Sequence, residues 1–153
     1  MLDQSEIPTS GSASMSGKAV FNVAYRYNQA NSDYGVKQYS GHATVNGSFN
    51  WGSGSYSGQL DFTNFDSGNS LVSNAGFTSF SISLAGSGAT YAGSLNDTNN
   101  GWTREAVIAG ALYGNNTPVE SGGRISVGLS KSGSLGTSGA NDFYMAEGIY
   151  LID

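Results

Sequence analysis

The chain offers few side chains that could carry catalysis or hold a metal ion. It has no cysteine and a single histidine, His42, among 153 residues. The lack of cysteine excludes thiolate nucleophiles, disulfides and cysteine-based metal sites. One histidine cannot form a histidine-rich metal site, although it could be an axial ligand of a haem iron. The alternative is an ordinary exposed histidine, because Ser40, Thr44 and Asn46 place His42 on a polar strand face.

Several short motifs resemble catalytic or metal-binding sequences but fail on their spacing. Gly54-Ser55-Tyr56-Ser57-Gly58 has the glycines of a nucleophile elbow, but a tyrosine stands where serine is required. Asp97-Thr98-Asn99-Asn100-Gly101 begins like a calcium loop, but its glycine comes one position early and no glutamate closes it. Glu105, Glu120 and Glu147 fall on different predicted strands and form no acid–base pair. The sequence therefore predicts a protein that is not an enzyme, with no metal site and with haem as its one candidate cofactor.

Aromatic residues in or beside predicted loops are the strongest candidates for binding. Tyrosine, tryptophan and arginine dominate the energetics of protein interfaces. The candidate set is Tyr27, Tyr34, Phe65 and Trp102, with Arg104 nearby. We expect this set to contact a partner protein. The alternative is that Phe65 and Tyr27 plug the end of the fold, while Trp51 caps its opposite end.

Alternating apolar and polar residues predict the strands that must position these candidates. In one stretch Tyr39, Gly41, Ala43 and Val45 fall on one face, and polar residues fall on the other. No helical period occurs anywhere, and roughly eight such strands predict an up-and-down antiparallel β-barrel, with a β-sandwich as the alternative. A barrel of this size is filled with side chains or holds one small ligand. The expected strands are Lys18–Tyr27, Tyr39–Gly47, Ser55–Phe62, Phe77–Leu84, Thr90–Leu95, Ala106–Gly114, Arg124–Leu129 and Asp142–Ile152.

The connections between these strands predict a barrel with two different ends. We expect residues 1–13 to be a flexible leader and residues 14–153 to be a single barrel domain. Alternate connections of an up-and-down barrel lie at the same end, so one end should carry four long loops. Long loops on a rigid scaffold commonly carry binding function. These loops are 28–38, 64–75, 96–103 and 132–140.

Composition and charge narrow the classes of partner. Charged residues make up 11% of the chain and the formal net charge is −5, against roughly 25% charged residues in an average domain. The six lysines and arginines form no cluster, which disfavours nucleic acid and anionic membrane surfaces. A membrane-embedded barrel is a weighed alternative. It is disfavoured because its polar interior would hold mostly serine, threonine and asparagine, with few charges for an internal network.

A hairpin in the second half of the chain resembles a known family. Gly110-Ala111-Leu112-Tyr113-Gly114 is followed by Glu120-Ser121-Gly122-Gly123. This pattern is similar to the G-x-F-Y/F-G-P…E-x-G-G hairpin in the eight-stranded barrels of transferrin-binding protein B and related lipoproteins and haemophores. Asn115 stands where the family has a proline. The matching residues are Gly110, Tyr113, Gly114, Glu120, Gly122 and Gly123.

The resemblance implies a non-enzymatic binding module of a bacterial surface lipoprotein or secreted protein. Family members serve iron acquisition at the bacterial cell outer membrane and bind host iron-carrier proteins, haem or haem proteins, or complement regulators. A signal peptide and a lipid anchor are expected to lie outside this chain. Two alternatives stay open, a carrier of haem or another small ligand and a structural or assembly domain of a larger surface protein. The oligomeric state is not predicted.

Overall fold

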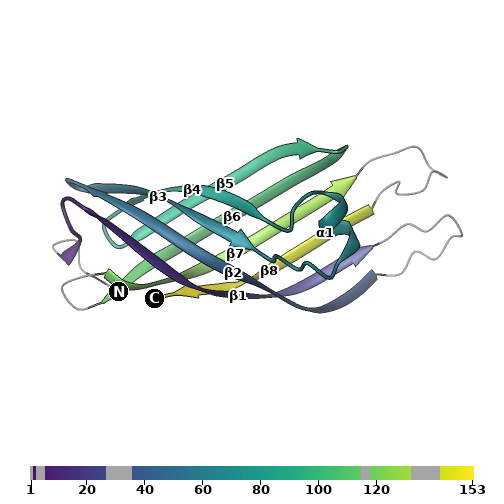
Figure 1. Ribbon diagram of the computed structural model, residues 1–153, viewed down its shortest axis with the longest axis horizontal. Helices are drawn as coiled ribbons and strands as arrows, with labels where there is room; N and C mark the ends of the chain where they lie inside the picture. Colours follow the sequence, from purple (N-terminus) through teal and green to yellow (C-terminus); the bar gives the residue numbers. More distant parts are fainter. Residues whose placement is uncertain (1, 3–5, 27–35, 115–117, 132–141) are drawn as a thin grey trace, which may run out of the picture.

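The fold is a closed antiparallel β-barrel whose eight strands follow up-and-down order (Figure 1). The computed structural model describes residues 2, 6–26, 36–114, 118–131 and 142–153. The elements are β1 (Ser12–Arg26), β2 (Val36–Gly52), β3 (Ser55–Thr63), α1 (Ser70–Asn74), β4 (Phe80–Ser87), β5 (Thr90–Asn99), β6 (Trp102–Gly114), β7 (Pro118–Lys131) and β8 (Asp142–Ile152). The architecture confirms the predicted barrel, and the pairing of β1 with β8 excludes the β-sandwich alternative.

The alternation of side chains along the strands places the apolar faces inside the barrel. On β2, Ala43 and Val45 are 2% and 0% exposed, while His42 and Thr44 face outward and are exposed. The same phase holds on β4, where Phe80, Ile82 and Leu84 are buried and the intervening residues are exposed. The period of two that predicted the strands therefore also predicts which residues form the core.

The connection between β5 and β6 is a tight turn, so the expected long loop at 96–103 is wrong. β5 continues to Asn99 and β6 begins at Trp102. Asn100 and Gly101 connect them with φ angles of 52° and 79°. Asparagine and glycine tolerate positive φ, which a two-residue hairpin turn requires at both central positions. The end expected to carry four long loops therefore carries one tight turn among its connections.

A short helix that the sequence did not predict lies in the connection between β3 and β4. α1 follows Asn69, whose side-chain Oδ1 accepts a hydrogen bond from the Leu71 N–H at 2.8 Å. Leu71 and Val72 are both buried. A helix this short shows no amphipathic period, because the period needs several turns to become visible. In the described part of the chain no helix is long and apolar enough to cross a membrane.

Residues before the predicted barrel boundary also take part in the fold. β1 begins at Ser12, so Ser12 and Ala13 belong to the barrel and not to the leader. Leu2 is buried, and its N–H donates to the Leu112 carbonyl oxygen at 3.2 Å. The chain termini lie together at the end of the barrel opposite α1 (Figure 1).

Aromatic side chains fill the interior and face glycines on neighbouring strands. Phe21 pairs with Gly41, and a methyl group at Gly41 would lie 2.3 Å from the Phe21 ring. The register repeats this pairing of an aromatic residue with a glycine at Phe49–Gly58, Tyr56–Gly86, Tyr91–Gly110 and Tyr150–Gly123. At Gly41, Gly86 and Gly110 an added methyl group would meet a tyrosine or phenylalanine side chain, so these glycines provide the volume that the aromatic side chains occupy. At Gly58 it would meet the Ser48 carbonyl oxygen instead.

The glycines of the β6–β7 hairpin make room for a hydrogen-bonded tyrosine cluster. Gly110 pairs with Gly123, and a methyl group at Gly110 would lie 2.4 Å from the Tyr150 hydroxyl. The Tyr150 hydroxyl donates to the Tyr91 hydroxyl at 2.8 Å. The Tyr91 hydroxyl lies 2.5 Å from Ser121 Oγ. The motif that carries the family resemblance thus has a packing role at its centre.

The outer part of the same hairpin is exposed. Tyr113 pairs with Glu120, and both side chains face solvent. The register shifts between Tyr113 and Gly114, which pairs with Pro118. Gly122 pairs with Ala111. Asn115, the position of the family's proline, lies outside the described residues.

We expect Gly123→Ala to lower the free energy of unfolding by about 1–3 kcal/mol, as overpacking does. A methyl group at Gly123 would lie 2.2 Å from the Ala109 carbonyl oxygen. Gly128→Ala is the matched control on the same strand, because a methyl group there meets nothing within 4 Å. The control should leave stability unchanged or raise it by up to about 1 kcal/mol. Urea unfolding measures both, and equal stability of the two variants would contradict this account.

Candidate functional site

The long connection between β3 and β4 closes one mouth of the barrel. Residues 64–79, which we call the mouth loop, contain α1 and lie over this end (Figure 1). Phe65 and Phe77 point inward and are both 0% exposed. The Phe65 ring stacks on Phe21 at a centroid distance of 4.5 Å, and Phe77 stacks on Phe80 at 4.0 Å. The mouth loop therefore continues the apolar core as a plug.

A buried carboxylate fixes the mouth loop to the barrel wall. Asp66 adopts a φ of 40° and is 9% exposed. Its Oδ2 accepts hydrogen bonds from the hydroxyls of Tyr39 on β2 and Tyr144 on β8, the latter at 2.8 Å. The Asn69 side-chain amide donates to the Tyr39 hydroxyl at 2.8 Å. The Asp66 N–H donates to the His42 carbonyl oxygen at 3.1 Å. These bonds join the mouth loop to two strands that lie on either side of β1.

Arg104 fixes the other end of the mouth loop. Its guanidinium donates to the carbonyl oxygens of Ala75 and Gly76 at 3.2 and 3.0 Å. The same group forms a bidentate pair with Asp97, with both N–O distances 2.6 Å. The guanidinium also lies over the Phe77 ring at 5.6 Å. The planar fork of arginine suits it to these simultaneous contacts.

The electrostatics of the mouth follow from these contacts. Burial raises the pKa of the Tyr144 hydroxyl, and the nearby Asp66 carboxylate raises it further. The pKa of Tyr39 is raised by the same two influences. The hydrogen bond from Arg104 holds the pKa of Asp97 below its usual value. The two tyrosines therefore act as neutral donors to a carboxylate, which is a stable structural arrangement at neutral pH.

The predicted aromatic set falls into the packing of the mouth. Phe65 and Trp102 are 0% and 2% exposed, and Arg104 packs on the mouth loop. This corrects the expectation of an exposed set, and Phe65 adopts the alternative role of a plug. The physical reason is that both rings pack into the hydrophobic core. Tyr27 and Tyr34 lie outside the described residues.

Two further candidates, His42 and Trp51, lie where the sequence predicts them. His42 points outward from β2 and is exposed. Trp51 lies at the opposite end of the barrel and stacks on Phe49 at 5.7 Å, as expected of a cap. No group of three or more histidine, aspartate or glutamate side chains that could hold a metal ion occurs among the described residues.

The outward surface of the mouth loop is small and polar. Its exposed residues include Ser67, Ser70, Ser73, Asn74 and Ser79. The inward side chains of the mouth loop hold this surface in place, because Phe65 and Phe77 are packed and Asp66 is hydrogen-bonded. The mouth loop is the one long connection at this end whose structure is described.

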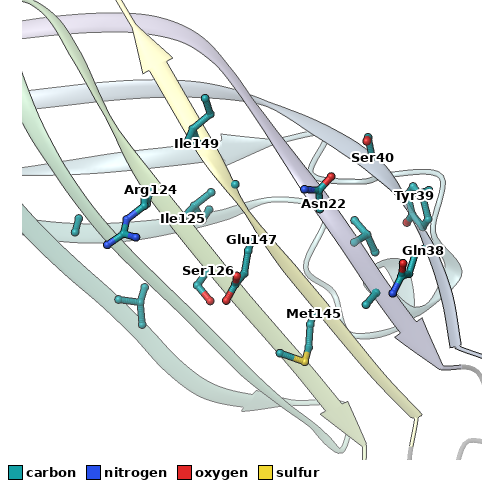
Figure 2. A pocket seen from close by; sticks show the side chains of 15 residues that line it. Asn22, Gln38, Tyr39, Ser40, Arg124, Ile125, Ser126, Met145, Glu147 and Ile149 are labelled. Atoms are coloured by element: carbon teal, nitrogen blue, oxygen red, sulfur yellow. The ribbon is translucent and has the colours of Figure 1, made fainter.

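A second feature, which sequence reasoning missed, is a groove on the outer wall of the barrel. The groove crosses the outer faces of β6, β7, β8, β1 and β2 and has a volume of about 1060 Å³ (Figure 2). Val107, Met145 and Ile149 line it beside Arg124 and Glu147. The sequence did contain a sign of this groove. Met145, Ile149 and Leu151 are apolar residues at outward positions of β8, where polar residues would be expected.

No protein-family model matches the chain, and no curated protein sequence matches it. Function is therefore inferred from the geometry described above and from the resemblance of the β6–β7 hairpin.

We expect Tyr144→Phe to lower the free energy of unfolding by about 1–3 kcal/mol, because the buried Asp66 carboxylate loses a donor. Tyr113→Phe is the matched control, since that side chain is 37% exposed, and it should change stability by less than about 0.5 kcal/mol. Urea unfolding at neutral pH measures both variants. A Tyr144→Phe protein as stable as the wild type would show that Asp66 does not depend on this bond.

The buried tyrosines also predict an alkaline transition. Burial raises the pKa of five tyrosines above the ordinary value of 10.0, namely Tyr39, Tyr56, Tyr91, Tyr144 and Tyr150. A pKa raised by folding stabilises the native state fully below pH 10, and this stability is lost as pH rises further. We expect tyrosinate absorbance from these residues to appear only together with the loss of β-sheet circular dichroism. Tyrosinate absorbance from all nine tyrosines near pH 10 with intact circular dichroism would contradict this.

Proposed function

We propose that this chain is a non-enzymatic binding module of an exported or surface-tethered bacterial protein. Its role would be to capture a host or extracellular protein at the end that carries the mouth loop. The resemblance to transferrin-binding protein B-like barrels favours a role in iron acquisition. The expected location is extracellular or at the bacterial cell surface.

The observation that carries this proposal is the anchoring of the mouth loop. Asp66 and Arg104 hold the loop from opposite sides, while Phe65 and Phe77 hold it from below. A surface that is already ordered loses little conformational entropy when it binds a partner. Its exposed serines and asparagine resemble the adaptable polar contacts that antibody loops use. Tyr39, which is 37% exposed beside the loop, offers an aromatic contact.

The filled interior favours a protein partner over a carried small molecule. Large side chains such as Phe49, Leu60 and Ile108 are fully buried inside the barrel. A haem or similar ligand would therefore have to bind at the outer wall or at the mouth. His42, the candidate haem ligand, projects from the outer face.

We expect Ser73→Arg and Asn74→Arg to weaken partner capture at least about tenfold, equivalent to about 1.4 kcal/mol. Each substitution adds a long charged side chain to the exposed surface of α1 and leaves the packed side unchanged. The measurement is biolayer interferometry with the immobilised chain against transferrin, haemoglobin and a complement regulator. Ser57→Arg, on the exposed outer face of β3, is the matched control and should bind like the wild type.

Two outcomes would count against this proposal. If all three variants bind a probe equally well, the mouth loop is not part of the binding interface. Failure of every protein probe, together with a saturable Soret shift on haemin titration, would favour the small-ligand alternative. His42→Ala would then test whether that side chain is the iron ligand.

A further inference from the structure

The outer surface of the barrel has two walls of different chemistry. The outward residues of β3, β4 and β5 are small and polar, among them Ser57, Gln59, Ser81, Ser83 and Ser94. The opposite wall is formed by β6, β7, β8 and β1. That wall carries six of the eight exposed large hydrophobic side chains in the described part of the chain. One is Tyr113 near the turn of the β6–β7 hairpin, and the others are Val20, Val107, Met145, Ile149 and Leu151. The apolar residues are therefore concentrated on one side.

Val20, Ile149 and Leu151 are adjacent, and together with Val107 and Met145 they define what we call the apolar wall. Val20 pairs with Ile149 across β1 and β8. Val107 pairs with Ser126, which in turn pairs with Glu147 on β8. Val20, Ile149 and Leu151 are 55%, 60% and 60% exposed. A contiguous apolar surface of this kind marks an interaction site more often than scattered exposed residues do.

Two opposite charges, Arg124 on β7 and Glu147 on β8, lie within the apolar wall. Arg124 pairs with Ile149 and Glu147 pairs with Ser126, so the charges are diagonal neighbours on β7 and β8. Figure 2 shows their side chains standing in the groove without pointing toward each other. Arg104 and Asp97, by contrast, form an ion pair beside the mouth loop. Lys18 on β1 and Glu105 on β6 are also exposed on this wall, so outward charges of both signs occur there, although the whole chain carries a formal charge of −5.

We propose that the apolar wall binds the apolar wall of a second copy of this chain. A two-fold axis lying in the interface midway between Arg124 and Glu147 would place each charge opposite the other charge of the second copy. An isologous interface requires such self-complementarity, because the same patch must serve on both sides. Arg124 and Glu147, one positive and one negative group beside exposed apolar side chains, meet this requirement. A partner of single-sign charge would leave one of the two groups unpaired at the interface.

The dimer would leave the mouth loop free, because the mouth lies at the end of the barrel and the wall lies along its side. This inference is therefore independent of the proposed capture of a partner. Either property could fail while the other holds.

Sedimentation velocity over a series of protein concentrations tests the proposal. The wild type should approach twice the 15.8 kDa mass of one chain as concentration rises. Arg124→Glu and Glu147→Arg should each weaken self-association by at least about tenfold, because each places like charges together twice in the symmetric interface. The double variant Arg124→Glu/Glu147→Arg restores opposite charges and should dimerise like the wild type.

The control variants are Ser57→Arg and Ser57→Glu, which add the same charges to the polar wall and should leave self-association unchanged. Circular dichroism establishes that each variant is folded. A wild type that stays monomeric at every concentration would overturn the proposal, whether or not it binds lipid vesicles or another protein. A folded double variant that stays monomeric while the wild type dimerises would also overturn it, since the charges would then not face each other.

Discussion

The interior of this barrel depends on the pairing of aromatic rings with glycines across neighbouring strands. A small barrel must be filled with side chains, and aromatic rings fill it only where the facing backbone leaves space. Phe21 opposite Gly41 and Tyr56 opposite Gly86 show the constraint directly, since a methyl group at either glycine would lie within 2.3 Å of a ring atom. The high content of glycine and the high content of aromatic residues are therefore linked, because the rings need the space that the facing glycines leave. The family-like hairpin belongs to the same solution through Gly110 and Gly123.

The strand pattern could be predicted from the sequence, but the register between strands could not. A period of two assigns each residue to a face, and the inward positions of β2, β3 and β4 follow from it. Which glycine faces which ring depends on the alignment of strands distant in sequence, and a periodic pattern holds no information about that alignment. The β5–β6 turn was mistaken for a loop because Asn96 and Thr98 are polar. They are outward strand residues, and Asn100-Gly101 was the decisive turn signal.

The mouth could not be predicted because it is assembled from side chains far apart in the sequence. Asp66, Tyr39 and Tyr144 lie on three separate segments, and none stands in a recognisable motif. Phe65 and Trp102 have the residue types of an interface, yet residue type does not tell whether a ring points out or into a core. The Phe65 ring is buried among other aromatic rings, namely those of Phe21, Phe77, Phe80 and Tyr144. The few residues of α1 show no helical period. A carboxylate followed by a helix-capping asparagine, as in Asp66 and Asn69, was the available hint.

A filled and closed barrel leaves only its ends and its outer walls for recognition. Closure removes the free strand edges through which many sheets bind partners. The end that holds the termini is capped by Trp51 and tight turns, so the mouth loop and the outer walls are the remaining described surfaces. These surfaces differ in kind, since the mouth loop is polar and firmly anchored whereas the wall of β6, β7, β8 and β1 is apolar with charges of both signs. A polar, pre-ordered surface suits reversible capture of a partner, and an apolar, self-complementary wall suits association of like subunits. The packing of the core does not explain why one wall is covered with serines and the other is apolar. The outward residues of both walls point away from the interior and take no part in that packing.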